Sequence, residues 1–120
     1  MKTSELIGPA LDWAVAKCEF VGTPPFIIVS GCIYTIEGDN WNPSTDWAQG
    51  GPIIEREGVS VSKYATSLNQ PPEAAWFASE WNDDVNMEHI QEGPTALVAA
   101  MRCYVASKLG DEIEIPEELK

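Results

Sequence analysis

The sequence has 120 residues, of which 44% are hydrophobic and 9% aromatic, a composition typical of a chain that folds around a core. At this length we expect one domain spanning residues 1–120. Nineteen acidic residues against seven basic ones give a formal net charge of −12. This charge repels phosphate backbones and anionic membrane surfaces at long range, so the composition argues against direct nucleic-acid binding.

The sequence predicts a chain that stays outside membranes and in a reducing compartment. No apolar run approaches the ~20 residues of a membrane span, and the amino terminus lacks the basic start and apolar middle of a signal peptide. The cysteines Cys18, Cys32 and Cys103 lie in apolar stretches without CxxC spacing. We therefore expect buried, reduced thiols, with no metal site and no cofactor.

The first predicted element is a helix that begins at Gly8, with Pro9 at the first position, where a missing N–H is tolerated. Its apolar stripe consists of residues at helical spacing: Leu11, Ala14, Val15 and Cys18. After this helix, Phe26 to Ile36 is rich in β-branched and aromatic residues and predicts a strand, bulged at Ser30-Gly31.

The middle of the chain has weaker patterns. Trp41 to Pro52 follows neither helical nor strand periodicity, which predicts a structured loop. Short strands are predicted over Ile53 to Arg56 and Val59 to Tyr64, joined as a hairpin at Glu57-Gly58. A further strand is predicted from Trp76 to Trp81, with Trp76 and Phe77 on opposite faces, and residues 83–92 are expected to be acidic, aperiodic and exposed.

The last predicted helix has clear boundaries, because Gly93-Pro94-Thr95 opens it and Gly110 closes it. The intervening ALVAAMRCYVASKL has strong helix propensity. Residues 110–120 are acidic, and we expect them to form a partly extended tail. Together the elements predict an α+β domain in which helices at the two ends pack a mostly antiparallel sheet of about four or five short strands.

The chain resembles the NinX-like proteins of lambdoid and related tailed phages in three segments: LDWAVAKCE (Leu11 to Glu19), PSTDWAQGGPIIEREG (Pro43 to Gly58) and GPTALVAAMRCYVASKLGDEIEIPEEL (Gly93 to Leu119). The resemblance implies a phage or prophage accessory protein in the cytoplasm of the bacterial host, dispensable for building the virion. It implies no reaction. Residues 59–92 lie outside these segments, and we expect any adaptation to a particular ligand there.

The segment around PSTDWAQGGPIIERE is the strongest functional lead, because it combines aromatic, hydroxyl, amide and carboxylate side chains with a bare Gly-Gly backbone. Such groups suit a ligand with a ring, several hydroxyls and a phosphate. The candidate ligand-binding residues are Trp41, Ser44, Thr45, Asp46, Trp47, Gln49, Gly50, Gly51 and Arg56. Lys63 and Arg102 are further candidate cations for a phosphate. The structural alternative is a capped turn, a glycine bend and two tryptophans that anchor the core.

Catalysis has thinner support. No GxSxG, HExxH, GxxxxGK[ST] or GxGxxG motif occurs, and the one histidine, His89, lies in the acidic stretch NDDVNMEHIQE. If the protein is a nucleotide hydrolase, the candidate groups are Asp46, Glu55, Glu57 and His89.

The acidic residues cluster, since Glu73 to Glu92 contains six acids and no base, and Asp111 to Lys120 contains five acids and one lysine. Clustered carboxylates are what a DNA mimic would present to a basic cleft of a host protein, although solvated acidic faces are commoner.

Three hypotheses follow. The leading one is a non-catalytic protein that sequesters a small nucleotide-like molecule, for example a cyclic nucleotide or ADP-ribose-type immune signal, as a counter-defence. The alternatives are an acidic inhibitor of a host protein and a nucleotide hydrolase. A small domain encloses a polar ligand poorly, so we expect a homo-oligomer, with the last helix as a dimer face where Ala99, Ala100 and Cys103 permit close approach.

Overall fold

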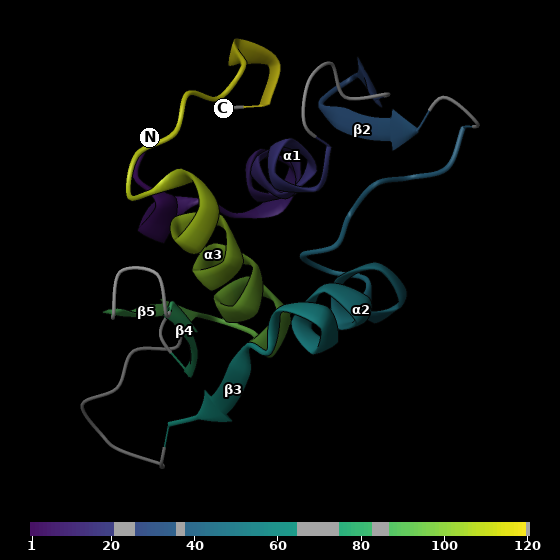
Figure 1. Cartoon of the computed structure of the whole chain (residues 1–120). Coiled ribbons are helices and arrows are strands. Elements are labelled where there is room, and N and C mark those ends of the chain that lie inside the picture. Colours follow the sequence, from purple (N-terminus) through teal and green to yellow (C-terminus); the bar gives the residue numbers. More distant parts are fainter. Residues whose placement is uncertain (21–25, 36–37, 65–74, 83–86, 120) are drawn as a thin grey trace.

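A computed structural model describes residues 1–20, 26–35, 38–64, 75–82 and 87–119. The helices in these ranges are α1 (Gly8–Glu19), α2 (Trp47–Glu57) and α3 (Ala96–Leu109), with short 3₁₀ turns η1 (Thr3–Glu5) and η3 (Glu117–Leu119). The strands are β1 (Phe26–Val29), β2 (Cys32–Thr35), β3 (Ser60–Lys63), β4 (Trp76–Asn82) and β5 (Met87–Gly93). They form two antiparallel sheets, β1-β2 and β3-β4-β5, which confirms the predicted α+β architecture (Figure 1).

Helix α3 occupies the centre of the fold. It packs against all three strands of the larger sheet and against both α1 and α2 (Figure 1). Every residue from Leu97 to Ala106 is buried, as expected for a helix whose surface is covered on all sides. Its predicted limits are confirmed, since Thr95 caps its start and Gly110 follows its end.

This central position makes one prediction wrong. Ala99, Ala100 and Cys103 are fully buried within their own chain, so they cannot present a dimer face. The same packing buries Cys103 as expected, and its thiol donates to the carbonyl of His89 at 3.2 Å. Cys18 is half-buried, but Cys32 is exposed, which corrects the expectation that every thiol is buried.

The predicted first helix is confirmed as α1, which buries Leu11, Ala14 and Val15. The strand expected from Phe26 to Ile36 is instead the hairpin β1-β2, in which Val29 pairs with Cys32; Ile36 lies outside the described residues. Ser30 and Gly31 have φ values of 52° and 77°, the left-handed conformation that tight two-residue hairpin turns require. A turn therefore stands where a bulge was predicted.

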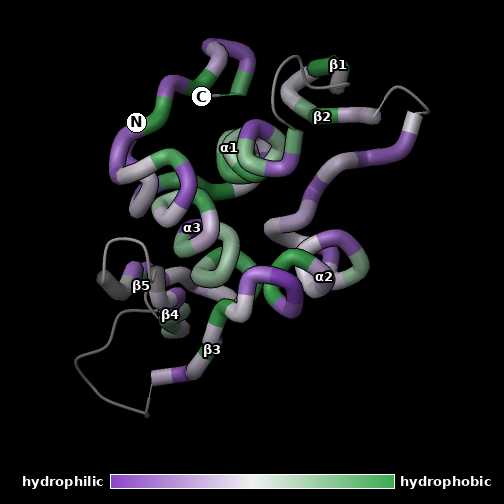
Figure 2. Tube along the Cα trace, viewed as in Figure 1, coloured by the Kyte–Doolittle hydropathy of each residue, from purple (hydrophilic) through white to green (hydrophobic). Residues whose placement is uncertain are grey.

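Helix α2 replaces the second half of the loop predicted over Trp41–Pro52 and the whole strand predicted over Ile53–Arg56. The loop prediction is therefore confirmed only up to Asp46, and the strand prediction is wrong. Asp46 caps its first turn by accepting the Ala48 N–H at 2.9 Å. Gly58, with a φ of 70°, ends the helix and is not a hairpin turn. Ile53 and Ile54 favour a strand by their local preference. In the fold Ile53 is buried as part of α2, and this packing outweighs the local preference. Figure 2 shows both hydrophilic and hydrophobic residues along α2.

The strand expected after Gly58 is confirmed as β3, and the one from Trp76 to Trp81 as β4. Trp76 and Phe77 lie on opposite faces of β4, whose Ala78 and Glu80 are buried. Much of the acidic segment expected to be aperiodic is strand β5, which pairs with β4 along Met87–Gly93; residues 83–86 lie outside the described ranges. Hydrogen bonding to β4 holds β5 extended, and this interaction between distant segments leaves no periodic pattern in the sequence of β5.

The acidic tail returns beside the amino terminus (Figure 1). The Ile113 N–H donates to the Met1 carbonyl at 2.9 Å, and the backbones of Lys2 and Glu112 form an isolated antiparallel β-bridge. Ile113 and Ile115 are buried while Glu112 and Glu114 are exposed, an alternation that fits an extended segment with one face on the core. Among the described helices, no helix is both long enough and apolar enough for a membrane crossing.

Candidate functional site

A groove of about 560 Å³ lies between the starts of three elements, α2, β4 and α3. We call it the tryptophan groove. Its lining residues are Ile7, Gly8, Ser44, Thr45, Trp47, Trp76, Pro94, Thr95, Ala96, Leu97 and Val98. Three of the predicted ligand-binding residues, Ser44, Thr45 and Trp47, are thus brought together with residues far from them in sequence.

Trp47 is an exposed aromatic side chain of this groove. It is the first residue of α2, and 58% of its surface is exposed. The cap formed by Asp46 fixes the backbone from which Trp47 projects. A Cβ added at Gly51 would lie 3.9 Å from Cε3 of the indole, so the ring passes over this glycine one turn further along. The result is a flat aromatic surface held on a rigid element and open to solvent.

Trp76 supplies a second aromatic wall. It is half-buried at the start of β4, and the Lys63 ammonium lies 5.9 Å from its ring centroid. A cation at this distance is attracted by the ring quadrupole. Lys63 thereby places a positive charge beside an apolar groove in a chain whose formal charge is −12.

The start of α3 contributes polar backbone to the groove. The first turn of a helix has N–H groups without intrahelical acceptors and carries the positive end of the helix dipole. The Thr95 hydroxyl accepts one of them, from Val98, at 3.1 Å. Ala96 and Leu97, also in this first turn, line the groove. The groove therefore combines aromatic walls with an electropositive end.

Trp41 and Gln49 tie the segment before α2 to the rest of the fold. The Trp41 indole N–H donates to the Asp12 carbonyl at 2.9 Å, and its ring meets Phe20 edge-on at 6.0 Å. The Gln49 side chain accepts the Asn42 N–H and donates to the Asn40 carbonyl, each at 2.7 Å. Neither residue lines the groove; Trp41 lines a separate hollow of about 200 Å³.

Asp12 of α1 is a buried acid that anchors the segment before α2. Its carboxylate accepts the Ser44 N–H at 2.8 Å. Burial raises the pKa of Asp12 to about 6, and hydrogen bonding from Ser44 offsets part of that shift. The signal available in the sequence was an acid within the otherwise apolar run LDWAVA.

Gly50 and Gly51 differ in what they do. Gly50 is buried, and its N–H donates to the Asp46 carbonyl at 2.9 Å inside the helix, so this donor is already used. A Cβ at Gly50 would lie 2.5 Å from the Pro43 carbonyl oxygen and 2.6 Å from Cδ2 of Leu97. Gly50 is therefore a point of close packing, and Gly51 leaves room for the Trp47 ring.

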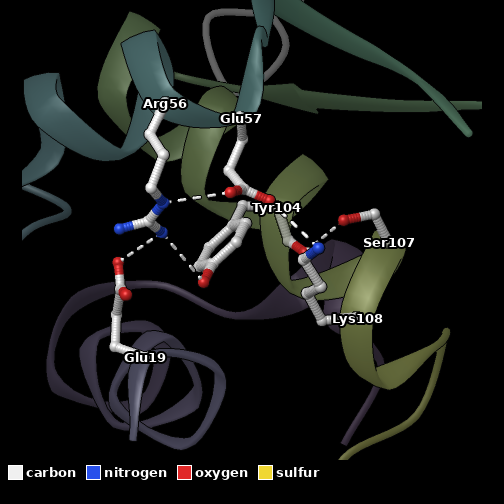
Figure 3. Close-up of polar contacts among 6 residues, drawn as sticks. All are labelled: Glu19, Arg56, Glu57, Tyr104, Ser107 and Lys108. Carbon is white, nitrogen blue, oxygen red and sulfur yellow. Dashed lines mark hydrogen bonds and ion pairs between the residues drawn. The ribbon is translucent and has the colours of Figure 1, made fainter.

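Arg56 lies at the far end of α2, about 14 Å along the helix axis from Trp47. Figure 3 shows its guanidinium between two carboxylates, with Glu19 at 2.8 Å and Glu57 at 3.0 Å, and beside the Tyr104 hydroxyl at 3.3 Å. Lys108 pairs with the other oxygen of Glu57 at 3.0 Å. The structure thus places Arg56 in a cluster of ion pairs at the junction of the three helices and away from the groove.

The candidate catalytic groups do not converge. Asp46 caps α2, Glu57 is paired with two cations, Glu55 is exposed, and His89 stands opposite Glu80 in the β4-β5 register. Within the described ranges none of these groups lines the tryptophan groove. Nor do the described His, Cys, Asp and Glu residues form a group of three that could hold a metal ion.

The chain matches a protein family over most of its length. The family model described as "Bacteriophage P22, NinX" matches residues 2–108. No curated protein matches the chain. Because the match covers nearly the whole chain, including α1, α2 and the central helix α3, this protein belongs to the NinX family of phage proteins.

Proposed function

We propose that this NinX-family protein binds and sequesters a small nucleotide-like molecule in the tryptophan groove without converting it. The observation that carries the proposal is Trp47, a 58% exposed indole held at the first position of a capped helix. Large aromatic side chains are normally buried for their apolar surface, and an exposed one on a rigid element offers a stacking face for a planar ring.

The size and chemistry of the groove support a ligand of this class. Its volume of about 560 Å³ lies within the range of small-molecule sites. Trp47 and Trp76 offer aromatic surface, and the Thr95 hydroxyl, whose oxygen accepts the Val98 N–H, still has its own O–H to donate. The positive end of the α3 dipole and the ammonium of Lys63 favour an anionic substituent.

Sequestration is favoured over turnover by the lining residues. Those that the structure describes carry hydroxyl, indole and aliphatic side chains, without a carboxylate, imidazole or thiol to transfer a proton. A protein with such a site can lower the free concentration of a signalling nucleotide, which would serve a phage in the host cytoplasm as a counter-defence. The groove is open on one side, so a second copy of the chain is the expected cover.

Calorimetric titration tests the proposal with cyclic dinucleotides, ADP-ribose, cyclic ADP-ribose and NAD. The informative variant is Trp47→Ala, and its matched control is Trp81→Ala, which removes an indole of similar exposure, 55%, from outside the groove lining. Loss of one stacked ring should weaken binding by roughly 10- to 100-fold, equivalent to 1–3 kcal/mol. The control should bind as the wild type does. Equal binding by both variants, or no binding by the wild type, would count against the groove.

A further inference from the structure

A second hollow, of about 530 Å³, lies between η1, β5 and the first half of α3. We call it the arginine hollow, because Arg102 lines it together with Ser4, Ile90 and Gln91. Ile7 and Pro94 line both this hollow and the tryptophan groove. The two cavities are therefore neighbours that share a wall.

Arg102 is buried, with 8% of its surface exposed. Its Nε–H donates to the Leu6 carbonyl and its Nη1 donates to the Glu92 carbonyl, both at 2.7 Å. Among the described residues no carboxylate pairs with it, in contrast to Arg56, which has two. Within the part of the chain that the structure describes, Arg102 is thus a buried cation whose hydrogen-bond partners are backbone carbonyls.

The nearest acidic residue on the hollow does not neutralise Arg102. Glu92 offers it only a backbone carbonyl. Glu92 stands opposite Phe77 in the β4-β5 register, and the Phe77 ring lies 4.7 Å from the Tyr64 ring, so the Glu92 side chain leaves the sheet on the side of Tyr64. The guanidinium has five N–H groups in a planar fork, and the two carbonyls use two of them. The two N–H groups of Nη2 therefore have no hydrogen-bond acceptor among the described residues, and Arg102 lines an open hollow.

We propose that the arginine hollow binds the phosphoryl group of the ligand whose ring occupies the tryptophan groove. This inference rests on the proposed function for the ring, while the anion site itself rests on Arg102. A buried guanidinium without a carboxylate is costly, and an oxyanion is the group that its fork fits best. Because Ile7 and Pro94 line both cavities, the aromatic walls and the cation belong to adjacent sites, as the ring and the phosphoryl group of a single ligand require. The ligand class is thereby narrowed to a phosphorylated nucleoside.

The experiment follows the Arg102 Nε–H signal by NMR during titration with inorganic phosphate, which needs no knowledge of the nucleotide. The variant Ser4→Glu adds a carboxylate on the hollow without removing the hydrogen bonds of Arg102. Its matched control is Ser62→Glu, the same change at an exposed position of β3. Thermal melting verifies that both variants fold.

We expect phosphate to shift the Arg102 signal in the wild type and in Ser62→Glu, with affinity reduced roughly tenfold or more in Ser4→Glu. An unchanged Arg102 signal in the wild type, or equal phosphate affinity in both variants, would overturn the inference. The two proposals fail separately. If phosphate shifts Arg102 but Trp47→Ala binds the nucleotide panel as the wild type does, the anion site stands and the groove proposal falls.

Discussion

The carboxylate of Asp12 accepts the backbone N–H of Ser44 at 2.8 Å. This bond joins α1 to the segment that leads into α2, and the indole of Trp41 adds a second link to the Asp12 carbonyl. The position of Trp47, three residues after Ser44, therefore depends on a buried acid in a different helix. The site is built on the fold and not on a free loop.

Burial of Asp12 has a consequence for pH dependence. Its pKa is raised from 3.8 to about 6 in the folded protein, so the folded state holds this proton more tightly than the unfolded chain does. Stability is then lost as pH rises from about 4 to 6, by about 3 kcal/mol in total. The variant Asp12→Asn keeps an acceptor for Ser44 and removes the titration, so its melting temperature should fall less across this range.

The control for this experiment is Glu114→Gln, which removes one exposed negative charge. It separates the effect of Asp12 from the general repulsion in a chain of charge −12. Glu114→Gln should show the wild-type pH dependence. If Asp12→Asn and Glu114→Gln behave alike, burial of Asp12 is not the cause.

The adjacent glycines of α2 should respond in opposite directions to alanine. Gly50→Ala places a methyl group against the Pro43 carbonyl and Leu97, and overpacking of this kind costs about 1–3 kcal/mol. Gly51→Ala makes only an ordinary contact with Trp47 and should stabilise the helix by about 0.5–1 kcal/mol. Urea unfolding of the two variants measures both changes. Equal effects would mean that α2 does not pack on α3 at Gly50.

Arg56 provides a test of where the site ends. Its ion pairs are half-exposed, so Arg56→Ala should cost up to about 1 kcal/mol of stability. Because Arg56 lies about 14 Å from Trp47 along α2, the variant should retain ligand binding. Calorimetry on the folded variant measures this directly. A loss of affinity comparable with that of Trp47→Ala would extend the site to this ion-pair cluster.

The elements that could be predicted from the sequence are those with local signals. Pro9 and a regular apolar stripe mark α1, and Thr95 and Gly110 mark α3. Helix α2 was missed because Gly50, Gly51 and Pro52 disfavour a helix locally, while the Asp46 cap and the packing of α2 against α3 stabilise one. Such packing is a tertiary effect that no local pattern contains.

The site likewise has parts that local sequence signals predict and parts that only tertiary packing brings together. Ser44, Thr45 and Trp47 were singled out by composition, and the structure places all three on one groove. Trp76 and the start of α3 join them only through the sheet and the central helix. Arg102 was named as one of several possible cations, but its burial without a carboxylate among the described residues is visible only in the folded chain.

Native mass spectrometry of the protein incubated with the nucleotide panel tests the central claim most directly. The released ligand is weighed to establish whether it is intact. We predict a complex of the wild type with an unaltered nucleotide, retained by Trp81→Ala and lost by Trp47→Ala, and the same spectrum reports the number of chains. A nucleotide released in altered form would contradict sequestration, and the absence of any complex would contradict a nucleotide site in the tryptophan groove.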